Sequence, residues 1–462
     1  MDFTNNNVVL WNFMVQMGML AAILLLANVL RRKVPFFRKA LMPTAVLAGF
    51  IALILRVTNI LKLNNSLMEM VTYHTIAIGF IALSLIIPKK EGNASKAFVG
   101  SKTGALIVSC YLLQGFMGLV ISIGLAYTIR PGLFKAAGIL LPMGFGQGPG
   151  QANNVGSTYE ALGFKGGQSF GLSIAAMGFV VACVVGVFYL NYLKRKNLIS
   201  FKGESDESAS ADGEAEFENQ NEIPVSESVD KFSIQIALVL IVYLITWFTA
   251  TGLTKILERS GDFAKSLIPL IWGFNFIFGS LFAVVVRVLL KSFRKMGWMR
   301  RQYQNNYLLA RISGYSFDLM VVTGICTINF EALRGLWLPF ILMSIAGTIG
   351  TFVYLKWICK KLYADYYFES FLSIYGMMTG VISSGVLLLR EVDPKYETPA
   401  ANNLVLGSSF AIGFGFPMLI LIGIAPKSDL LVLVTMGFCA LYFFMLLAFL
   451  LLVKQKAAGK KA

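Results

Sequence analysis

Long apolar runs, separated by short clusters of charged residues, dominate the pattern of this 462-residue chain. An α-helix needs about 20 apolar residues to cross the hydrocarbon core of a bilayer. Eleven runs of this kind predict transmembrane helices near residues 8–30, 40–57, 70–88, 104–128, 168–192, 233–254, 266–290, 312–330, 335–355, 402–425 and 430–453. The pattern therefore predicts an all-α integral membrane protein with about eleven transmembrane helices.

Two further apolar segments, residues 133–162 and 367–398, are interrupted by glycine and polar residues. Such interruptions break a helix and release backbone N–H and C=O groups at membrane depth, where they need polar partners. We interpret both segments as re-entrant hairpins. The alternative for the first is an extracellular loop rich in turn residues, and for the second it is the packing of small residues between helices.

The composition, 56% hydrophobic and 14% charged residues, agrees with a membrane protein. The net charge of +16 comes from basic residues in short loops rather than from a continuous stripe, which argues against a nucleic-acid partner. With the N-terminus outside, 29 of the 40 lysines and arginines fall on the cytoplasmic side. This bias predicts a multi-pass protein of the plasma membrane whose linker and C-terminus are cytoplasmic. The first apolar run lacks a cleavage pattern and is expected to be retained.

The two halves of the chain follow the same plan of four spans, one hairpin and one more span. Five crossings per half place the second half in the membrane upside down, so the hairpins have opposite orientations and the halves are inverted repeats. Broken helices at equivalent positions of inverted repeats are typical of secondary transporters. The predicted domains are a first repeat, an acidic disordered cytoplasmic linker, a second repeat, and an additional helix with a basic tail, at residues 1–199, 200–231, 232–428 and 429–462. The linker is either a solvated tether or lies against basic cytoplasmic loops.

Neutral amides concentrate at the first hairpin, at Gln147, Gln151, Asn153 and Asn154. Amides can bind a carboxylate or a cation without the cost of a buried charge. Half-helix N-termini favour anions, and free backbone carbonyls coordinate Na⁺. A second asparagine pair, Asn402 and Asn403, follows the second hairpin and shares a neighbouring Gly-Ser with the first pair. Both asparagine pairs are therefore candidate Na⁺ ligands. The first hairpin lacks the Gly-Lys-Ser/Thr ending of a phosphate-binding loop.

Two ionisable side chains, those of Asp318 and His74, fall well inside predicted spans, and Arg287 also lies inside one. Asp318 is a candidate ligand for Na⁺ or H⁺, but it follows Arg311 by only seven residues and is equally well explained as an interfacial residue. His74 is expected to be a hydrogen-bonded packing residue rather than a proton carrier. Gln114 and Asn275 are single amides within spans, and we expect them to form hydrogen bonds between helices.

The residue pattern does not indicate a catalytic site, a zinc site or a disulfide framework. The five cysteines lie in or beside apolar segments without a CxxC pair, and the chain has one histidine. We therefore expect that the protein is not an enzyme and binds no cofactor. The expected coupling ion is Na⁺. An ion channel is the alternative from another functional class, although no repeated filter or charge-rich span is present.

The hairpin sequences resemble those of a known family. "GFGQGPGQA" followed by "YEALGF", and "MMTGVISSGVLLLREVDP" followed by "NNLVLGSS", are similar to the two glycine-rich motifs of the sodium/glutamate symporter (ESS) family. In plan the resemblance covers residues 12–425. It implies a homodimeric Na⁺-coupled symporter with a scaffold domain and a moving transport domain that contains the hairpins. It also implies substrate- or ion-facing roles for eight residues: Gly146, Gln147, Gly148, Gly150, Gln151, Thr379, Ser383 and Ser384.

The motifs also depart from that family. Gln147 stands where the family motif has a histidine, and Val381 and Ile382 replace part of a run rich in glycine and threonine. The expected substrate is therefore glutamate or a related small carboxylate, with a dicarboxylate or hydroxycarboxylate as the alternative. H⁺ is the alternative to Na⁺ as the coupling ion. The expected partners are this small anion, Na⁺, the lipid bilayer and a second copy of the chain.

Overall fold

The structure is a computed structural model that describes residues 8–39, 41–87, 94–199, 231–259, 268–273, 275–299, 301–393 and 398–453. Within these ranges every regular element is a helix, which confirms the predicted all-α class. Apart from Lys231, the predicted linker at 200–231 lies outside the described residues.

Ten helices within the described ranges are long and apolar enough to cross a membrane. They are α1 (Val8–Lys33), α4 (Asn65–Leu85), α5 (Ala94–Tyr127), α7 (Gly167–Arg195), α8 (Lys231–Glu258), α11 (Asn275–Lys295), α12 (Asn306–Cys326), α13 (Trp337–Leu362), α16 (Ala400–Ile424) and α17 (Asp429–Leu452). They coincide with ten of the eleven predicted spans. The chain is therefore a multi-pass membrane protein.

The eleventh predicted span, residues 40–57, is the exception. It forms α3 (Thr44–Val57), a helix of 14 residues. At 1.5 Å per residue this helix is about 21 Å long, which is shorter than the ~30 Å hydrocarbon core of a bilayer. Within the described residues, ten of the eleven predicted spans are therefore helices of spanning length, and α3 is not. Short helices also form at α2 (Pro35–Lys39) and α10 (Ile268–Gly273).

The chain divides into two compact units whose segments alternate along the sequence. The first unit comprises residues 1–20, 61–90 and 203–324, and the second comprises residues 21–60, 91–202 and 325–462. Each predicted repeat therefore contributes to both units. The boundary between the units falls inside α1, between Leu20 and Ala21.

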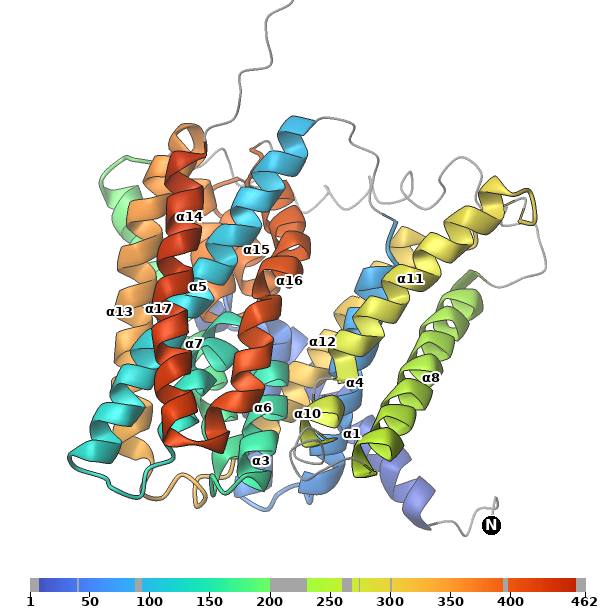
Figure 1. Cartoon of the computed structure of the whole chain (residues 1–462), viewed down its shortest axis with the longest axis horizontal. Coiled ribbons are helices and arrows are strands. Elements are labelled where there is room, and N and C mark those ends of the chain that lie inside the picture. The colour runs from blue at the N-terminus through green and yellow to red at the C-terminus, as the bar shows by residue number, and fades with distance from the viewer. Residues whose placement is uncertain are drawn as a thin grey trace, which may run out of the picture. The chain divides into compact units, whose positions relative to one another are not determined.

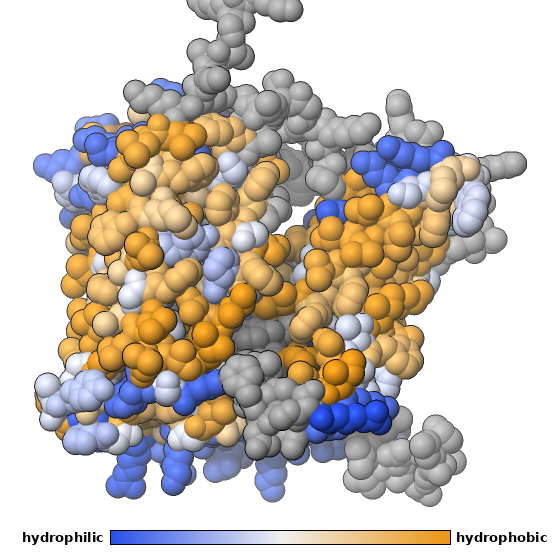
Figure 2. All heavy atoms as spheres, viewed as in Figure 1, coloured by the Kyte–Doolittle hydropathy of each residue, from blue (hydrophilic) through white to orange (hydrophobic). Residues whose placement is uncertain are grey.

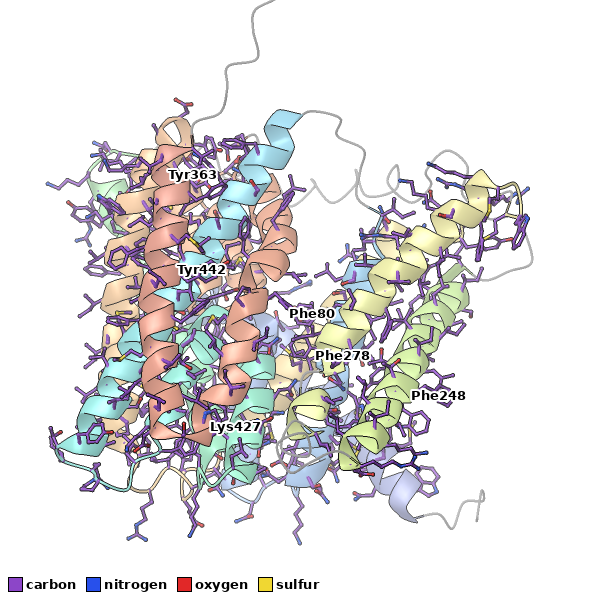
Figure 3. All side chains as sticks on the ribbon, viewed as in Figure 1. Phe80, Phe248, Phe278, Tyr363, Lys427 and Tyr442 are labelled. Atoms are coloured by element: carbon purple, nitrogen blue, oxygen red, sulfur yellow. The ribbon has the colours of Figure 1, made fainter. Side chains whose placement is uncertain are left out.

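The first unit is built from α4, α8, α11 and α12 around a small apolar core. The buried side chains of this core are Ile81, Ala82, Leu85, Val239, Val242, Ala283 and Leu309. Phe248 on α8 is 61% exposed and projects away from this core (Figure 3). Such an outward apolar surface suits contact with lipid.

Polar side chains in the first unit bind backbone and hydroxyl groups. Arg287, a charged residue within α11, donates from Nη1 to the carbonyl oxygens of Ser84 and Ile86, at 2.9 Å each. It thus satisfies carbonyls at the end of α4, where the helix has no partners of its own. Asn275 donates to the Tyr243 hydroxyl at 3.3 Å, which confirms its predicted interhelical hydrogen bond. His74 Nδ1 lies 2.6 Å from the same hydroxyl, as expected for a hydrogen-bonded packing residue.

The second unit is organised around α5 and α7. Helix α5 packs against α13, α16 and α17, and α7 packs against α13 and the helices of both broken segments (Figure 1). Buried hydroxyl pairs join α5 to the end of α13, at Ser109–Tyr354 (2.6 Å) and Thr103–Tyr363 (2.7 Å). Both broken segments are therefore held within one unit.

Helix α17, predicted as an additional helix, is also tied to the second unit. The Tyr442 hydroxyl donates to the Phe414 carbonyl of α16 at 2.8 Å. Lys135 donates to Asp429 at the start of α17, and this hydrogen-bonded ion pair raises the pKa of the Lys135 ammonium. In each unit hydrophobic side chains cover the visible outer surface of the helices, and hydrophilic ones gather toward their ends (Figure 2).

Candidate functional site

The first predicted hairpin is a broken helix. It begins with a short 3₁₀-helix (Lys135–Ile139) and a π-helical turn (Pro142–Gly146), and continues as α6 (Pro149–Ala161). Gly148 connects the two parts with φ +85°, a conformation that side chains with a Cβ rarely adopt. The Ala152 N–H donates to the Gly148 carbonyl, so the N–H groups of Gly150 and Gln151 precede the first bond of α6. This break therefore presents the N-terminal end of a half-helix.

The second predicted hairpin breaks in the same manner. Helix α14 (Tyr367–Thr379) is followed by Gly380, and α15 (Ile382–Arg390) begins after the extended residue Val381. The Ser384 N–H donates to the Val381 carbonyl at 2.9 Å. This break thus presents the C-terminal carbonyls of α14 and the N-terminal end of α15.

The two breaks meet in the second unit. A Cβ added to Gly148 would lie 2.7 Å from Cγ1 of Val381 and 3.6 Å from the carbonyl oxygen of Gly380. Gly148 and Val381 are the residues that precede the first turns of α6 and α15. Two positive helix ends therefore converge on one region, an arrangement that an anion stabilises.

Helix α7 supports the second break from one side. A Cβ on Gly178 would lie 2.2 Å from the carbonyl oxygen of Thr379, the last residue of α14. Only glycine allows the two backbones to approach this closely. The end of α14 is therefore positioned by direct backbone contact with a transmembrane helix.

Gln114 of α5 contacts both breaks. Its side-chain nitrogen donates to the Thr351 hydroxyl (2.8 Å) and to the Met378 carbonyl (2.9 Å). Because a carbonyl only accepts, the nitrogen must face Met378, and the orientation of the amide is fixed. Gln114 Oε1 then lies 3.0 Å from where a Cβ of Gly146 would be, buried and without a hydrogen-bond partner among the described residues.

Several other buried polar atoms of the two broken segments have no hydrogen-bond partner within the part of the chain that the structure describes. They are Gln151 Oε1, both amide atoms of Asn154, Ser370 Oγ, Tyr375 OH and Ser384 Oγ. An unpaired buried polar group costs about 1–3 kcal/mol, so native structures rarely keep one without a reason. Acceptor oxygens and donor groups of this kind can bind a cation and a carboxylate together.

The structure brings together most of the substrate-facing residues that the resemblance implied. Gly146, Gln147, Gly148, Gly150 and Gln151 form the first break and the first turn of α6, and Thr379 ends α14. Ser383 and Ser384 lie in the first turn of α15, and Ser383 is described in its backbone only. These residues lie close together because Gly148 of the first break contacts Val381 of the second.

The predicted Na⁺ ligands are placed less uniformly. Asn154 is unpartnered as described above, whereas Asn153 accepts a hydrogen bond from Gln168 at 2.9 Å. Asn403 donates to the Tyr366 hydroxyl at 2.8 Å, and the side chain of Asn402 lies outside the described residues. Asp318 is an exposed residue of α12 and belongs to the first unit, whereas both breaks belong to the second. The breaks and Asp318 are therefore not members of one compact unit.

No family model matches the chain, and no curated protein sequence is significantly similar to it.

Sequence reasoning explained Gln114 only as a helix-packing amide. Its predicted hydrogen bonding between helices is confirmed by the bonds to Thr351 and Met378, but its unpaired oxygen at the first break, among the described residues, was not predicted. The available signal was a single amide within the apolar run of α5. Tyr375 was likewise overlooked, since a tyrosine in an apolar helix usually indicates packing.

Proposed function

We propose that the protein is a secondary active transporter that couples the movement of glutamate or a related small carboxylate to Na⁺ by alternating access. The observation that carries this proposal is the contact between the two breaks, where the starts of α6 and α15 converge among unpartnered amide and hydroxyl groups. The alternatives are another organic anion as substrate and H⁺ as the coupling ion.

Helix polarity supports an anionic substrate. The N–H groups at the start of each half-helix point away from their own helix, and each N-terminus carries about half a positive charge. Two such ends repel each other unless an anion lies between them. A substrate carboxylate would accept from the backbone N–H groups of Gly150 and Gln151 and from the Ser384 hydroxyl.

Oxygen atoms nearby support a small cation. Gln114 Oε1, Gln151 Oε1 and Asn154 Oδ1 are unpartnered acceptors among the described residues. Neutral oxygens of this kind, with backbone carbonyls of broken helices, are the usual Na⁺ ligands of secondary transporters. A cation bound here would also offset the charge of the substrate and so link the binding of the two.

The division into two units supports movement of one unit against the other. Both broken segments lie in the second unit, so they would move together as a transport domain, with the first unit as scaffold. Pairing of helices across the predicted repeats also agrees with inverted symmetry. Helix α5 packs on α16, and their predicted counterparts α13 and α7 pack on each other. The re-entrant course of the hairpins and a homodimeric assembly are parts of the same proposal.

Uptake into proteoliposomes tests the proposed function. Labelled glutamate, with aspartate, 2-oxoglutarate, malate and citrate as unlabelled competitors, is offered under an inward Na⁺ gradient and then without one. Saturable uptake that requires the Na⁺ gradient is the expected result. Uptake that follows a pH gradient instead would identify H⁺ as the coupling ion, and single-channel currents would overturn the transporter assignment.

A pair of serine variants links that activity to the breaks. Ser384→Ala removes an unpartnered hydroxyl and should reduce uptake at least about tenfold, the effect of losing one charge-assisted hydrogen bond. Ser101→Ala is the matched control, because its hydroxyl donates to the Phe98 carbonyl of its own helix. Equal loss of uptake in both variants would dissociate the activity from this site.

A further inference from the structure

A groove of 260 Å³ runs along the outer surface of the second unit between α7 and α13. Its lining is mostly aromatic and consists of Val185, Phe188, Tyr189, Tyr192, Phe352 and Lys356. Phe188 is 75% exposed and Tyr192 47%. Because α7 and α13 are both long enough to span the membrane, apolar rings exposed here suit contact with lipid.

The groove leads toward a concentration of positive charge. Phe145 lies against Gly178 of α7 and Gly347 of α13, and further along both helices the ring of Tyr189 lies 5.1 Å from that of Phe352. The two helices therefore run in the same direction and finish at the same end. Five exposed basic residues lie at that end besides Lys356, namely Lys194 and Arg195 on α7, Lys196 directly after it, and Lys360 and Lys361 on α13. Two acidic residues, Asp365 and Glu369, follow in the chain and leave a net positive charge. The loop charges assign this end to the cytoplasm.

Lys356 joins the aromatic and the basic parts of the groove. Its ammonium lies 5.8 Å from the ring centres of both Tyr189 and Phe352. Its charged end therefore lies within cation–π reach of both rings, in the last two turns of α13. Tyrosine rings at this depth suit the boundary between acyl chains and headgroups.

We propose that this groove binds an anionic phospholipid, with the headgroup phosphate at Lys356 and an acyl chain along Phe188 and Tyr192. Basic pockets between spanning helices on the cytoplasmic side favour such headgroups. A second copy of the chain is a poorer occupant, because a symmetric contact would bring the same basic residues of both copies together.

A lipid in this groove would act on the second broken segment. The ring of Tyr189 lies 5.0 Å from that of Phe371, and the ring of Phe352 lies 5.3 Å from Phe371 and 5.6 Å from Tyr375. Phe371 and Tyr375 belong to α14, which ends at Thr379 beside the first break. Occupancy of the groove would therefore restrict the movement of α14.

Lipid retention measured by native mass spectrometry tests the binding site. The purified full chain is titrated in detergent with phosphatidylglycerol and, separately, with phosphatidylcholine. Lys356→Gln should weaken phosphatidylglycerol binding about fivefold, the effect of one lysine near an anionic surface, and leave phosphatidylcholine unchanged. Lys291→Gln, which alters an exposed lysine near the end of α11 in the first unit, is the matched control. Equal binding of the two lipids by the unaltered chain would overturn the proposal.

A second variant tests the apolar part of the groove without a change of charge. Val185→Trp places an indole in the space between α7 and α13 and should abolish selective retention of phosphatidylglycerol. Its thermal unfolding shows whether the Val185→Trp protein is folded, and Lys356→Gln remains informative if it is not.

Amide hydrogen exchange over residues 367–379 should slow when phosphatidylglycerol is added. Unchanged exchange in this segment, together with selective binding of phosphatidylglycerol, would overturn the inference that the lipid restricts the movement of α14. None of these measurements requires transport, so their failure is distinct from failure of the proposed function.

Discussion

Two kinds of buried amide occur around the breaks, and they differ in the number of side-chain hydrogen bonds that they form. Gln114 uses both of its N–H groups in hydrogen bonds to other helices. Asn154 has no side-chain partner within the described residues, although it is only 3% exposed. A residue of the second kind lowers the stability of the ligand-free protein and is explained by what it binds.

Leucine at Asn154 should separate stability from function. Asn154→Leu removes an unpaired buried amide, so the ligand-free protein should become more stable, by about 1 kcal/mol. Its stabilisation by Na⁺ and its uptake activity should be lost. Thermal unfolding with and without Na⁺ measures both effects.

The matched variant for Asn154→Leu is Gln114→Leu. This substitution leaves the Met378 carbonyl without its donor and should destabilise the ligand-free protein by about 1–3 kcal/mol. An Asn154→Leu protein that is less stable and still responds to Na⁺ would show that Asn154 is only a structural residue.

Alanine at Gly148 should cost more than backbone strain alone. Gly148→Ala combines φ +85° with a contact of 2.7 Å to Val381, whereas Gly163→Ala has φ +103° and nothing within 4 Å. We expect Gly163→Ala to lose about 1–2 kcal/mol of unfolding free energy and Gly148→Ala to lose more. Adding Val381→Ala should recover the difference. Denaturant unfolding of the three variants in detergent measures these losses, and equal losses at both glycines would contradict the contact between the breaks.

Among the elements, α7 is the helix on which the second broken segment depends most directly. Gly178→Ala would place a methyl group 2.2 Å from the Thr379 carbonyl and push α14 away. We expect a loss of at least about 2 kcal/mol in stability and a stronger loss of transport. Gly124→Ala in α5 is the control, because nothing lies within 4 Å and the better helix propensity should stabilise by up to about 1 kcal/mol. Thermal unfolding and uptake by both variants test this.

The sequence predicted the elements better than their partners. Apolar runs located the ten spanning helices, and glycine and proline at 142–150 and 376–385 located the breaks, because both signals are local. The length of α3 was overestimated, since the apolar run 40–57 includes residues before Pro43 that are not part of the helix. The contact of Gly148 with Val381 was beyond such reasoning, because it depends on packing between distant segments. For the same reason, the position of the unpaired Gln114 oxygen beside Gly146 was not predicted.

The orientation of the chain in the membrane is a prediction from loop charge alone. The exposed Ile129, after α5, is expected outside, and the exposed Lys196, after α7, in the cytoplasm. Single-cysteine labelling with a membrane-impermeant maleimide tests this in intact cells, where Ile129→Cys should react at once and Lys196→Cys only after permeabilisation. The five native cysteines are buried and should give little background. The reverse pattern would invert the topology.

The hydrogen bond from Gln114 to Met378 joins positions 264 residues apart. A ribosome adds about 5–20 residues per second, so the first break at Gly148 is synthesised roughly 12 to 46 seconds before Met378. During that interval its half-helix and unpaired amides lie in a partly made membrane protein. The nascent chain therefore depends on the insertion machinery or on lipid to shelter this polar surface until the second half arrives.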